Sequence, residues 1–286
     1  MAAQIIDGKA LAQQIRERIA KDCADLLAKK GIKPGLAAIL VGDDPASHIY
    51  VRNKQKACEA AGIYVDEHKL PATTSQADLL QLIARMNADP KIHGILVQLP
   101  LPKHIESKVI LEAVSPSKDA DGFHPYNFGR LVEGSPVFEA CTPKGVIKMI
   151  ESTGQSVEGK RAVVLGRSNI VGKPAALMLL QRNATVTVCH SKTKDLPAVC
   201  READILVVAI GRAKFVTADM VREGAMVLDV GTNRLPDGKL VGDVDYEPVR
   251  EKAGWITPVP GGVGPMTIAM LLDNTLESAQ RAAGLR

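Results

Sequence analysis

Two side chains that can handle protons lie four residues apart in the first fifth of the chain, Tyr50 and Lys54. A helix predicted from about residue 47 to residue 61 would place both on one face, because residues four apart project from the same side of a helix. A phenol and an amine at this spacing can take part in acid–base catalysis. The same helix carries Arg52 and Lys56, so its charges can equally form a solvated face. On these residues alone, both interpretations of Lys54 stay open.

Two more polar residues stand where ligands often bind. Gln98 lies near the end of a predicted strand over residues 94–99, and open α/β sheets bind ligands at the carboxyl ends of their strands. Asp121 lies in the sequence KDADG, where its carboxylate either anchors an amide-like ligand edge or closes an Asx turn. The glycine- and proline-rich run over residues 256–267 suits a backbone that lies close to a flat ligand.

A glycine-rich turn, AVVLGRSNIVGKP, begins with a predicted strand and leads into a helix. Its pattern is G-x-S-x-x-x-G over Gly166, Ser168 and Gly172, in which serine replaces the middle glycine of a dinucleotide fingerprint. The turn would still present helix N-terminal amides to a pyrophosphate. An isolated turn of this kind can also be purely structural, but a strand–helix–strand succession around it favours a dinucleotide site.

The second strand of that succession ends in Cys189-His190-Ser191-Lys192, without the acidic residue that usually accepts hydrogen bonds from the ribose of NAD. Arg167 and Ser191 could each donate to a 2′-phosphate, so NADP is the predicted cofactor. The alternative is that Arg167 and Lys192 are solvated surface charges.

These residues must be positioned by an α/β fold, because helix-period stretches alternate with short apolar strand runs. We predict strands over residues 36–41, 63–68, 94–99, 161–165, 185–189, 205–209 and 226–230. Residues 100–141 hold most of the turn-forming residues, and we expect loops and the domain junction there. We predict a catalytic domain over residues 1–141 and a Rossmann-like nucleotide domain over residues 142–265. The last segment, residues 266–286, is predicted to be a helix that packs back on the first domain.

Composition excludes several classes of protein. The net charge of +4 contains no long block of one sign, so neither nucleic acid nor an anionic membrane is an expected partner. Five scattered cysteines without zinc-ligand spacing predict reduced thiols, no bound metal and a cytoplasmic location.

Five motifs occur in a specific order: YVRNK, GILVQLPLP, KDADGFHPYN, GRSNIVGKP and PVPGGVGPMT. In these motifs, which are spread over essentially the whole chain, the sequence resembles bifunctional methylenetetrahydrofolate dehydrogenase/methenyltetrahydrofolate cyclohydrolases. The resemblance implies oxidation of 5,10-methylenetetrahydrofolate by NADP⁺ and hydrolysis of the methenyl product to 10-formyltetrahydrofolate, as part of one-carbon metabolism. It also implies a homodimer joined through the nucleotide domain.

The resemblance also implies roles for single residues. Lys54 would manage protons in the hydrolysis, Gln98 would orient Lys54, Tyr50 would stack on the folate, and Asp121 would hold the pterin amino edge. The implied folate contacts are Val97, Leu99, Pro260, Gly261, Gly262, Val263 and Gly264. The implied NADP contacts are Gly166, Arg167, Ser168, Ser191 and Thr232. Departures are small: Ala120 and Thr232 stand where valine and isoleucine are common.

Two competing functions remain consistent with the residues. A two-domain NADP dehydrogenase of another small substrate would use Lys54 and Asp121 as its proton-transfer pair. A nucleotide-sensing module would bind a ligand without turnover, but it would not need a proton-shuttling lysine.

Overall fold

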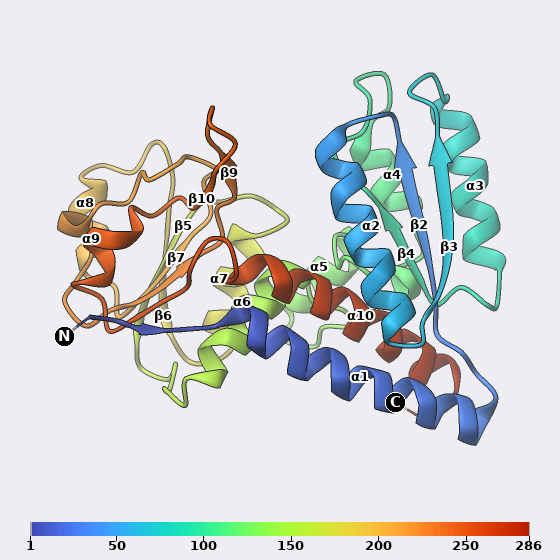
Figure 1. Ribbon diagram of the computed structural model, residues 1–286, viewed down its shortest axis with the longest axis horizontal. Helices are drawn as coiled ribbons and strands as arrows, with labels where there is room; N and C mark the ends of the chain where they lie inside the picture. The colour runs from blue at the N-terminus through green and yellow to red at the C-terminus, as the bar shows by residue number, and fades with distance from the viewer. Residues whose placement is uncertain (1, 286) are drawn as a thin grey trace. The chain divides into compact units, whose positions relative to one another are not determined.

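The computed structural model describes residues 2–285, apart from the side chains of residues 45–49, and divides into two compact units (Figure 1). Unit 1 contains the described residues up to Gln13 together with Thr142–Thr267. Unit 2 contains Gln14–Cys141 together with the described residues from Ile268 onward.

Unit 1 is built on a sheet of six strands. Their order across the sheet is β1 (Gln4–Ile5), β11 (Trp255–Ile256), β8 (Met226–Asp229), β7 (Ile205–Val208), β5 (Arg161–Leu165) and β6 (Thr185–Cys189). All neighbouring strands are parallel. The central strands β7 and β8 are buried along their whole length, as expected for parallel strands covered on both faces.

Short helices and a hairpin complete unit 1. They are α6 (Cys141–Ser152), α7 (Gly172–Leu180), α8 (Leu196–Arg201), the 3-10 turn η2 (Ala218–Met220), α9 (Tyr246–Arg250) and the antiparallel pair β9 (Asn233–Arg234) and β10 (Leu240–Val241). Apolar residues of α8, η2 and α9 pack with β5, β7, β8 and β11 in one core, while α7 contacts β5 and β6. The sheet therefore holds the carboxyl ends of its strands in a fixed row.

Unit 2 contains a parallel sheet of three strands, in the order β3 (Tyr64–Leu70), β2 (Gly35–Val41) and β4 (Gly94–Val97). Its helices are α2 (Pro45–Ala60), α3 (Gln76–Ala88), α4 (Ser107–Ala113), the 3-10 turn η1 (Pro116–Lys118), α5 (Pro125–Val132) and most of α1 (Gly8–Lys30) and α10 (Val263–Ala282), whose first residues belong to unit 1. One face of the sheet packs its apolar side chains against α3 and α4, and α2 contacts β2 and β3 (Figure 1).

The prediction of two α/β domains is confirmed. The prediction for the last helix is also confirmed, since the chain from Ile268 onward belongs to unit 2 with Gln14–Cys141. Within that unit, Arg18 of α1 donates to Asp273 of α10 at 2.7 Å. Ser75 caps α3, since its Oγ accepts a hydrogen bond from the N–H of Asp78.

The structure corrects the predictions at short elements. Residues 100–141 are largely turn and loop, as expected, but they also contain two short helices that were not predicted, α4 and α5, whose buried residues Ile110 and Leu131 lie among abundant turn formers. The connection between β7 and β8 contains only the three-residue turn η2, after which Val221 is extended. Strands β1 and β11 were not predicted at all, because two residues are too few to show a period.

No helix in the described part of the chain is both long and apolar enough to cross a membrane.

Candidate active site

Lys54 lies on α2 of unit 2 and is buried, with 7% of its surface exposed. Its Nζ donates a hydrogen bond to Oε1 of Gln98 at 3.2 Å. A buried ammonium or amine is costly without a polar partner, so this contact fixes where the nitrogen lies. The structure thus brings together two residues that are 44 positions apart in the chain.

Gln98 is oriented by its own contacts. It directly follows β4, and its N–H continues the sheet by donating to the Ile39 carbonyl at 2.9 Å. Its Nε2 donates to the carbonyl of Leu99 at 2.7 Å. An amide that uses its nitrogen as donor in this way leaves its oxygen as the acceptor for Lys54. Gln98 therefore acts as a fixed acceptor for Lys54.

Tyr50 lies one helical turn before Lys54 on α2 and is 41% exposed. Its ring is available to stack on a ligand, in contrast to the buried amine of Lys54. Leu99 is partly buried, whereas Val97 is buried in the apolar core with Ile39 and Ile95. A ligand could reach Val97 only through its backbone.

Asp121 is electrostatically coupled to Lys54. Burial raises the pKa of the Asp121 carboxyl to about 6, the Lys54 charge opposes this rise and the Asp119 charge adds to it. The carboxyl can therefore change its protonation state close to neutral pH. In unit 2, the buried lysine thus donates a hydrogen bond to an amide acceptor and interacts electrostatically with a carboxyl that titrates near neutral pH.

Asp119, which sequence reasoning missed, closes the turn around Asp121. Its Oδ1 accepts from the N–H groups of Gly122 (3.1 Å) and Phe123 (3.0 Å), and its Oδ2 accepts from the N–H of His124 and from Nδ2 of Asn127, both at 2.8 Å. We call these five residues the Asp119 cluster. Asp119, rather than Asp121, therefore supplies the Asx-type contacts of KDADG. The available sequence signal was an aspartate followed three residues later by a glycine.

Asn274 on α10 holds the same loop from the other side and was also missed. Its Nδ2 donates to the carbonyls of Ala120 (2.9 Å) and Glu139 (3.0 Å). The N–H of Cys141 donates to the Asp121 carbonyl at 3.1 Å. No sequence signal connects residues more than 130 positions apart, so only the folded chain reveals Asn274 as a support of the Asp121 backbone.

The glycine turn between β5 and α7 is closed tightly in unit 1. Gly166 has a φ of +126°, and a Cβ there would overlap the carbonyl of Ala209. A Cβ on Gly172 would overlap the carbonyl of Gly166. Both positions therefore require glycine. The Oγ of Ser168 accepts from the N–H groups of Val171 (3.1 Å) and Gly172 (3.3 Å), so these two amides already have an acceptor within the turn.

The donors around this turn fit NADP. Arg167 and Ser168 are exposed in the turn, and Ser191 is exposed just beyond β6. After β6 the chain forms a turn in which the N–H of Lys192 donates to Nδ1 of His190 at 3.1 Å. Hydroxyl and guanidinium donors without a carboxylate between them suit a 2′-phosphate. Thr232 is exposed beyond the end of a different strand, β8.

The segment before α10 also has closely packed backbone. The carbonyl of Gly261, whose φ is +106°, accepts from the N–H of Lys9 at 2.9 Å. A Cβ on Gly8 would overlap the carbonyl of Gly262. Val263 is buried, whereas Pro260 and Gly264 are exposed, and a Cβ on Gly264 would meet no atom within 4 Å. Exposed backbone is therefore available at Pro260 and Gly264.

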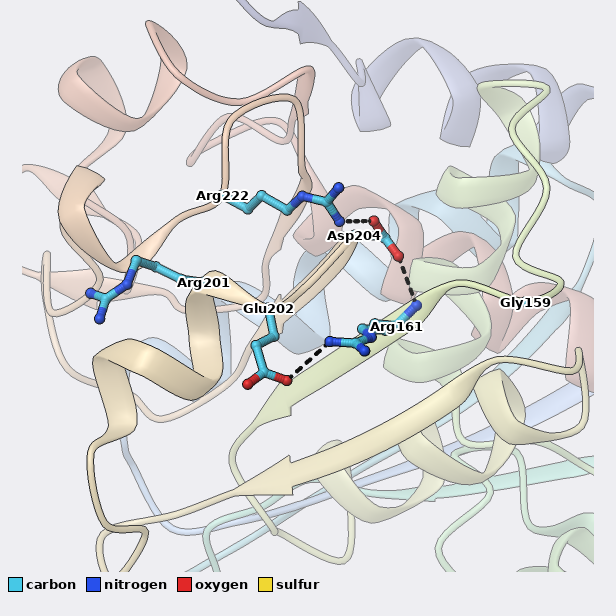
Figure 2. A pocket seen from close by; sticks show the side chains of 6 residues that line it. All are labelled: Gly159, Arg161, Arg201, Glu202, Asp204 and Arg222. Atoms are coloured by element: carbon cyan, nitrogen blue, oxygen red, sulfur yellow. Dashed lines mark hydrogen bonds and ion pairs between the residues drawn. The ribbon is translucent and has the colours of Figure 1, made fainter.

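A cavity in unit 1 lies away from these loops (Figure 2). Arg161 begins β5 and Asp204 directly precedes β7, so the cavity is at the amino ends of the strands, whereas the glycine turn is at their carboxyl ends. Figure 2 shows Arg161 paired with Glu202 and Arg222 paired with Asp204. Arg201 donates to the Asp219 carbonyl. Because these groups satisfy one another, the cavity shows no requirement for a ligand.

Comparisons with known proteins agree with this division of roles. The profile described as "Tetrahydrofolate dehydrogenase/cyclohydrolase, catalytic domain" matches residues 6–121. The profile described as "Tetrahydrofolate dehydrogenase/cyclohydrolase, NAD(P)-binding domain" matches residues 140–283.

Relatives match over nearly the full chain. "Bifunctional protein FolD" of Moorella thermoacetica is 59% identical over 98% of this chain and 100% of its own length. The crystal structure of the bifunctional FolD enzyme from Campylobacter jejuni is 53% identical, covers 98% of this chain and 99% of its own, and has a TM-score of 0.96. The Trypanosoma brucei enzyme, crystallised with NADP cofactor and inhibitor, is 41% identical, covers 99% of both chains and has a TM-score of 0.95.

The matching profiles together span both units, and the relatives align at high identity along almost the whole sequence. This chain belongs to the tetrahydrofolate dehydrogenase/cyclohydrolase family.

Proposed function

We propose that Lys54 is the proton-handling group of this dehydrogenase and cyclohydrolase, which acts on 5,10-methylenetetrahydrofolate in one-carbon metabolism and uses NADP. The observation that carries the assignment is the hydrogen bond from the buried Lys54 Nζ to Gln98, with the titrating Asp121 nearby. A lysine in such a setting can accept a proton from water and return one to a leaving nitrogen.

The oxidation needs little acid–base help from the protein. A folate nitrogen lone pair stabilises the cation that forms when the one-carbon bridge loses a hydride. NADP⁺, held by the cofactor residues proposed below, would supply the acceptor for that hydride. The residues of the chain mainly align the reactants, and such positioning is itself a large source of rate enhancement.

The hydrolysis needs proton transfer at two points. Water adds to the methenyl carbon and gives one proton to Lys54 Nζ, which leaves a neutral carbinolamine. The carbon–N5 bond then breaks as the hydroxyl becomes a formyl group, and N5 takes up a proton. The net products are 10-formyltetrahydrofolate and one proton. Gln98 keeps Nζ in position through both transfers, because its oxygen is fixed as an acceptor.

Binding residues are proposed on the same basis. Asp121 accepts hydrogen bonds from the amino edge of the pterin, and Tyr50 stacks on the ring. Further folate contacts come from Leu99, from the backbone of Val97, and from the segment Pro260, Gly261, Gly262, Val263 and Gly264. NADP contacts come from Gly166, Arg167, Ser168, Ser191 and Thr232. The exposure of Tyr50, Arg167, Ser191 and Thr232 supports these assignments.

The functional domains are proposed as residues 1–141 (catalysis), 142–265 (NADP) and 266–286 (a returning helix). The change of compact unit after Cys141 supports the first boundary, while residues 2–13 belong structurally with unit 1. A cytoplasmic location is proposed because all five cysteines are free and buried.

Lys54→Met tests the catalytic proposal. Hydrolysis of 5,10-methenyltetrahydrofolate, followed by its absorbance, should fall at least about 100-fold, since the general acid–base group is lost. The NADP⁺ dissociation constant should stay within about twofold of wild type. Lys56→Met, an exposed lysine on the same helix, is the matched control and should hydrolyse normally. Unchanged hydrolysis in Lys54→Met would remove lysine from the mechanism.

A homodimer through unit 1 is also proposed. Strand β6 is the edge of the six-stranded sheet, and the apolar side chains Val188, Leu180 and Ile170 are exposed at 39%, 56% and 39%. An unpaired edge with apolar side chains is a typical site of association. Light scattering should give twice the chain mass for wild type and the chain mass for Val188→Glu. A monomeric wild type would refute the dimer.

A further inference from the structure

A carboxylate in unit 1 gathers four donors from two loops. Asp243 is fully buried. Its Oδ2 accepts from the N–H groups of Ile210 (2.7 Å) and Gly211 (2.9 Å), and its Oδ1 accepts from the N–H of Arg212 (2.8 Å) and from Nδ2 of Asn233 (2.9 Å). We call these five residues the Asp243 cluster. One side chain therefore fixes both the loop after β7 and the segment after β8.

Asp229, the last residue of β8, holds the backbone from which Asp243 projects. Its carboxylate accepts from the N–H groups of Gly231 (3.0 Å), Asp243 (3.0 Å) and Val244 (2.9 Å). A Cβ on Gly231 would overlap the Asp243 carboxylate, and a Cβ on Gly242 would overlap that of Asp229. The two chain segments can approach this closely only with glycine at both positions.

The order of the strands indicates which part of a dinucleotide these loops face. A dinucleotide-binding sheet consists of two mononucleotide-binding halves that meet at its first strand. Here β5 precedes the glycine turn, β6 lies on one side of β5, and β7 and β8 lie on the other. The proposed pyrophosphate and 2′-phosphate contacts follow β5 and β6. The loops after β7 and β8 therefore belong to the nicotinamide half.

We propose that Asp243 is a positioning residue for the nicotinamide half of NADP. It holds the amides of Ile210–Arg212 and, through Asn233, the segment that presents Thr232. The proposal rests on the NADP dependence proposed above. Since Asp243 is buried and its carboxylate faces protein donors, it acts on the cofactor only through these two loops.

The test separates the two halves of the cofactor. Binding of NADP⁺ and of adenosine 2′,5′-bisphosphate, which lacks the nicotinamide half, is measured by calorimetry for wild type and Asp243→Asn. The measurements are made at pH 8, because burial raises the pKa of Asp229 to about 7 and protonation there would disturb the same backbone. The dissociation constant of NADP⁺ should rise about tenfold in Asp243→Asn, and that of the fragment should change less than about twofold.

Asp237→Asn is the matched control, because Asp237 is an exposed residue of the neighbouring hairpin turn that accepts from the N–H of Lys239. Both probes should bind Asp237→Asn as they bind wild type. Equal weakening of both probes in Asp243→Asn would assign Asp243 a general structural role and overturn the proposal, and so would unchanged binding of both. Wild type that binds neither probe would instead refute the NADP dependence.

A milder variant covers the case in which Asp243→Asn does not fold. Asn233→Ala removes one donor and keeps the carboxylate with its three amides. It should weaken NADP⁺ binding about threefold without affecting the fragment. Amide hydrogen exchange gives a measurement independent of the cofactor: in either variant that folds, the peptide containing residues 210–212 or that containing residue 232 should exchange faster. Wild-type exchange at both peptides, with wild-type NADP⁺ binding, would overturn the proposal.

Discussion

The Asp119 cluster of unit 2 and the Asp243 cluster of unit 1 contain the same kinds of hydrogen-bond donor, but the donors lie at different distances along the sequence from the aspartate. Each buries one carboxylate that accepts from three backbone N–H groups and one asparagine side chain. The donors to Asp119 lie three to eight residues away. The donors to Asp243 lie 10 to 33 residues away. The first cluster is therefore local, and the second joins distant segments.

This difference determines which parts of the fold must be in place before each cluster can form. The local cluster can form from one short segment, because closing a small loop requires little ordering of the rest of the chain. The long-range cluster requires that β7 and β8 are already paired, since these strands bring its loops together. We therefore expect a change at Asp119 to affect a single loop and its chemistry, and a change at Asp243 to affect two loops and cofactor binding.

The largest expected effect comes from Asp119→Ala. The variant removes the carboxylate that accepts from three buried or part-buried N–H groups and from the Asn127 amide, which should lower the free energy of unfolding by about 3 kcal/mol. Displacement of Asp121 should slow methenyl hydrolysis about 100-fold. Denaturant unfolding and the hydrolysis assay measure these effects.

The control for this variant is Asp25→Ala, which removes an exposed carboxylate of α1 that pairs with Lys29. It should change stability by less than about 0.5 kcal/mol and leave hydrolysis unchanged. NADP⁺ binding should stay normal in Asp119→Ala. If hydrolysis by Asp119→Ala stayed within about threefold of wild type, the Asp119 cluster would not position the reacting residues.

The pH dependence of hydrolysis should give the next largest effect. Burial raises the pKa of the Asp121 carboxyl to about 6, and only the ionised carboxylate accepts two hydrogen bonds from a ligand amino group. Folate binding and kcat/KM should therefore rise with pH through about 6 and fall about tenfold per unit below it. A pH profile of kcat/KM measures this rise; we call it the acidic limb of the profile.

Asp119→Asn tests whether Asp121 is the group that causes this rise of kcat/KM with pH. It removes a negative charge that raises the pKa of Asp121, so the midpoint of the limb should move to lower pH. A midpoint that stayed in place, or one that moved upward, would show that the limb belongs to another group. The comparison is made on the fraction of folded protein, measured in the same samples.

The smallest effect is expected for Ser168→Ala in the glycine turn. Ser168 is exposed and its neutral hydroxyl accepts from only two amides, in contrast to the buried carboxylates of the two clusters. Loss of such an N-terminal acceptor costs about 1 kcal/mol of stability. Thermal unfolding measures the change, and Ser156→Ala, in another turn of unit 1, is the comparison. A loss as large as that of Asp119→Ala would contradict this ranking of the clusters.

Much of the fold could be predicted from sequence patterns. Strands β5 and β6 have the predicted bounds, because the short apolar runs that form them are a local signal. The helices α4 and α5 escaped prediction because they are short and lie among turn-forming residues. Strands β1 and β11 escaped it because their pairing joins residues about 250 positions apart.

Some features of the candidate site also follow from sequence patterns, whereas others required the structure. Tyr50 and Lys54 on one helix, and the turn at Gly166, follow from spacing and residue type, and the family resemblance supplied their proposed roles. The hydrogen bond from Lys54 to Gln98 and the support of Asp121 by Asn274 required the folded chain. Asp119 lies two residues from Asp121, yet only the structure shows which of the two aspartates closes the turn.

By itself, the sequence determined the two α/β domains, the position of the glycine turn and the chemical types of the site residues, because these depend on local periodicity and on side-chain identity. The tertiary structure decided which carboxylates are buried, which amides they bind and which side chains remain exposed. These properties depend on contacts between segments that only the packed sheets bring together, and a buried carboxylate is stable only where such donors meet it.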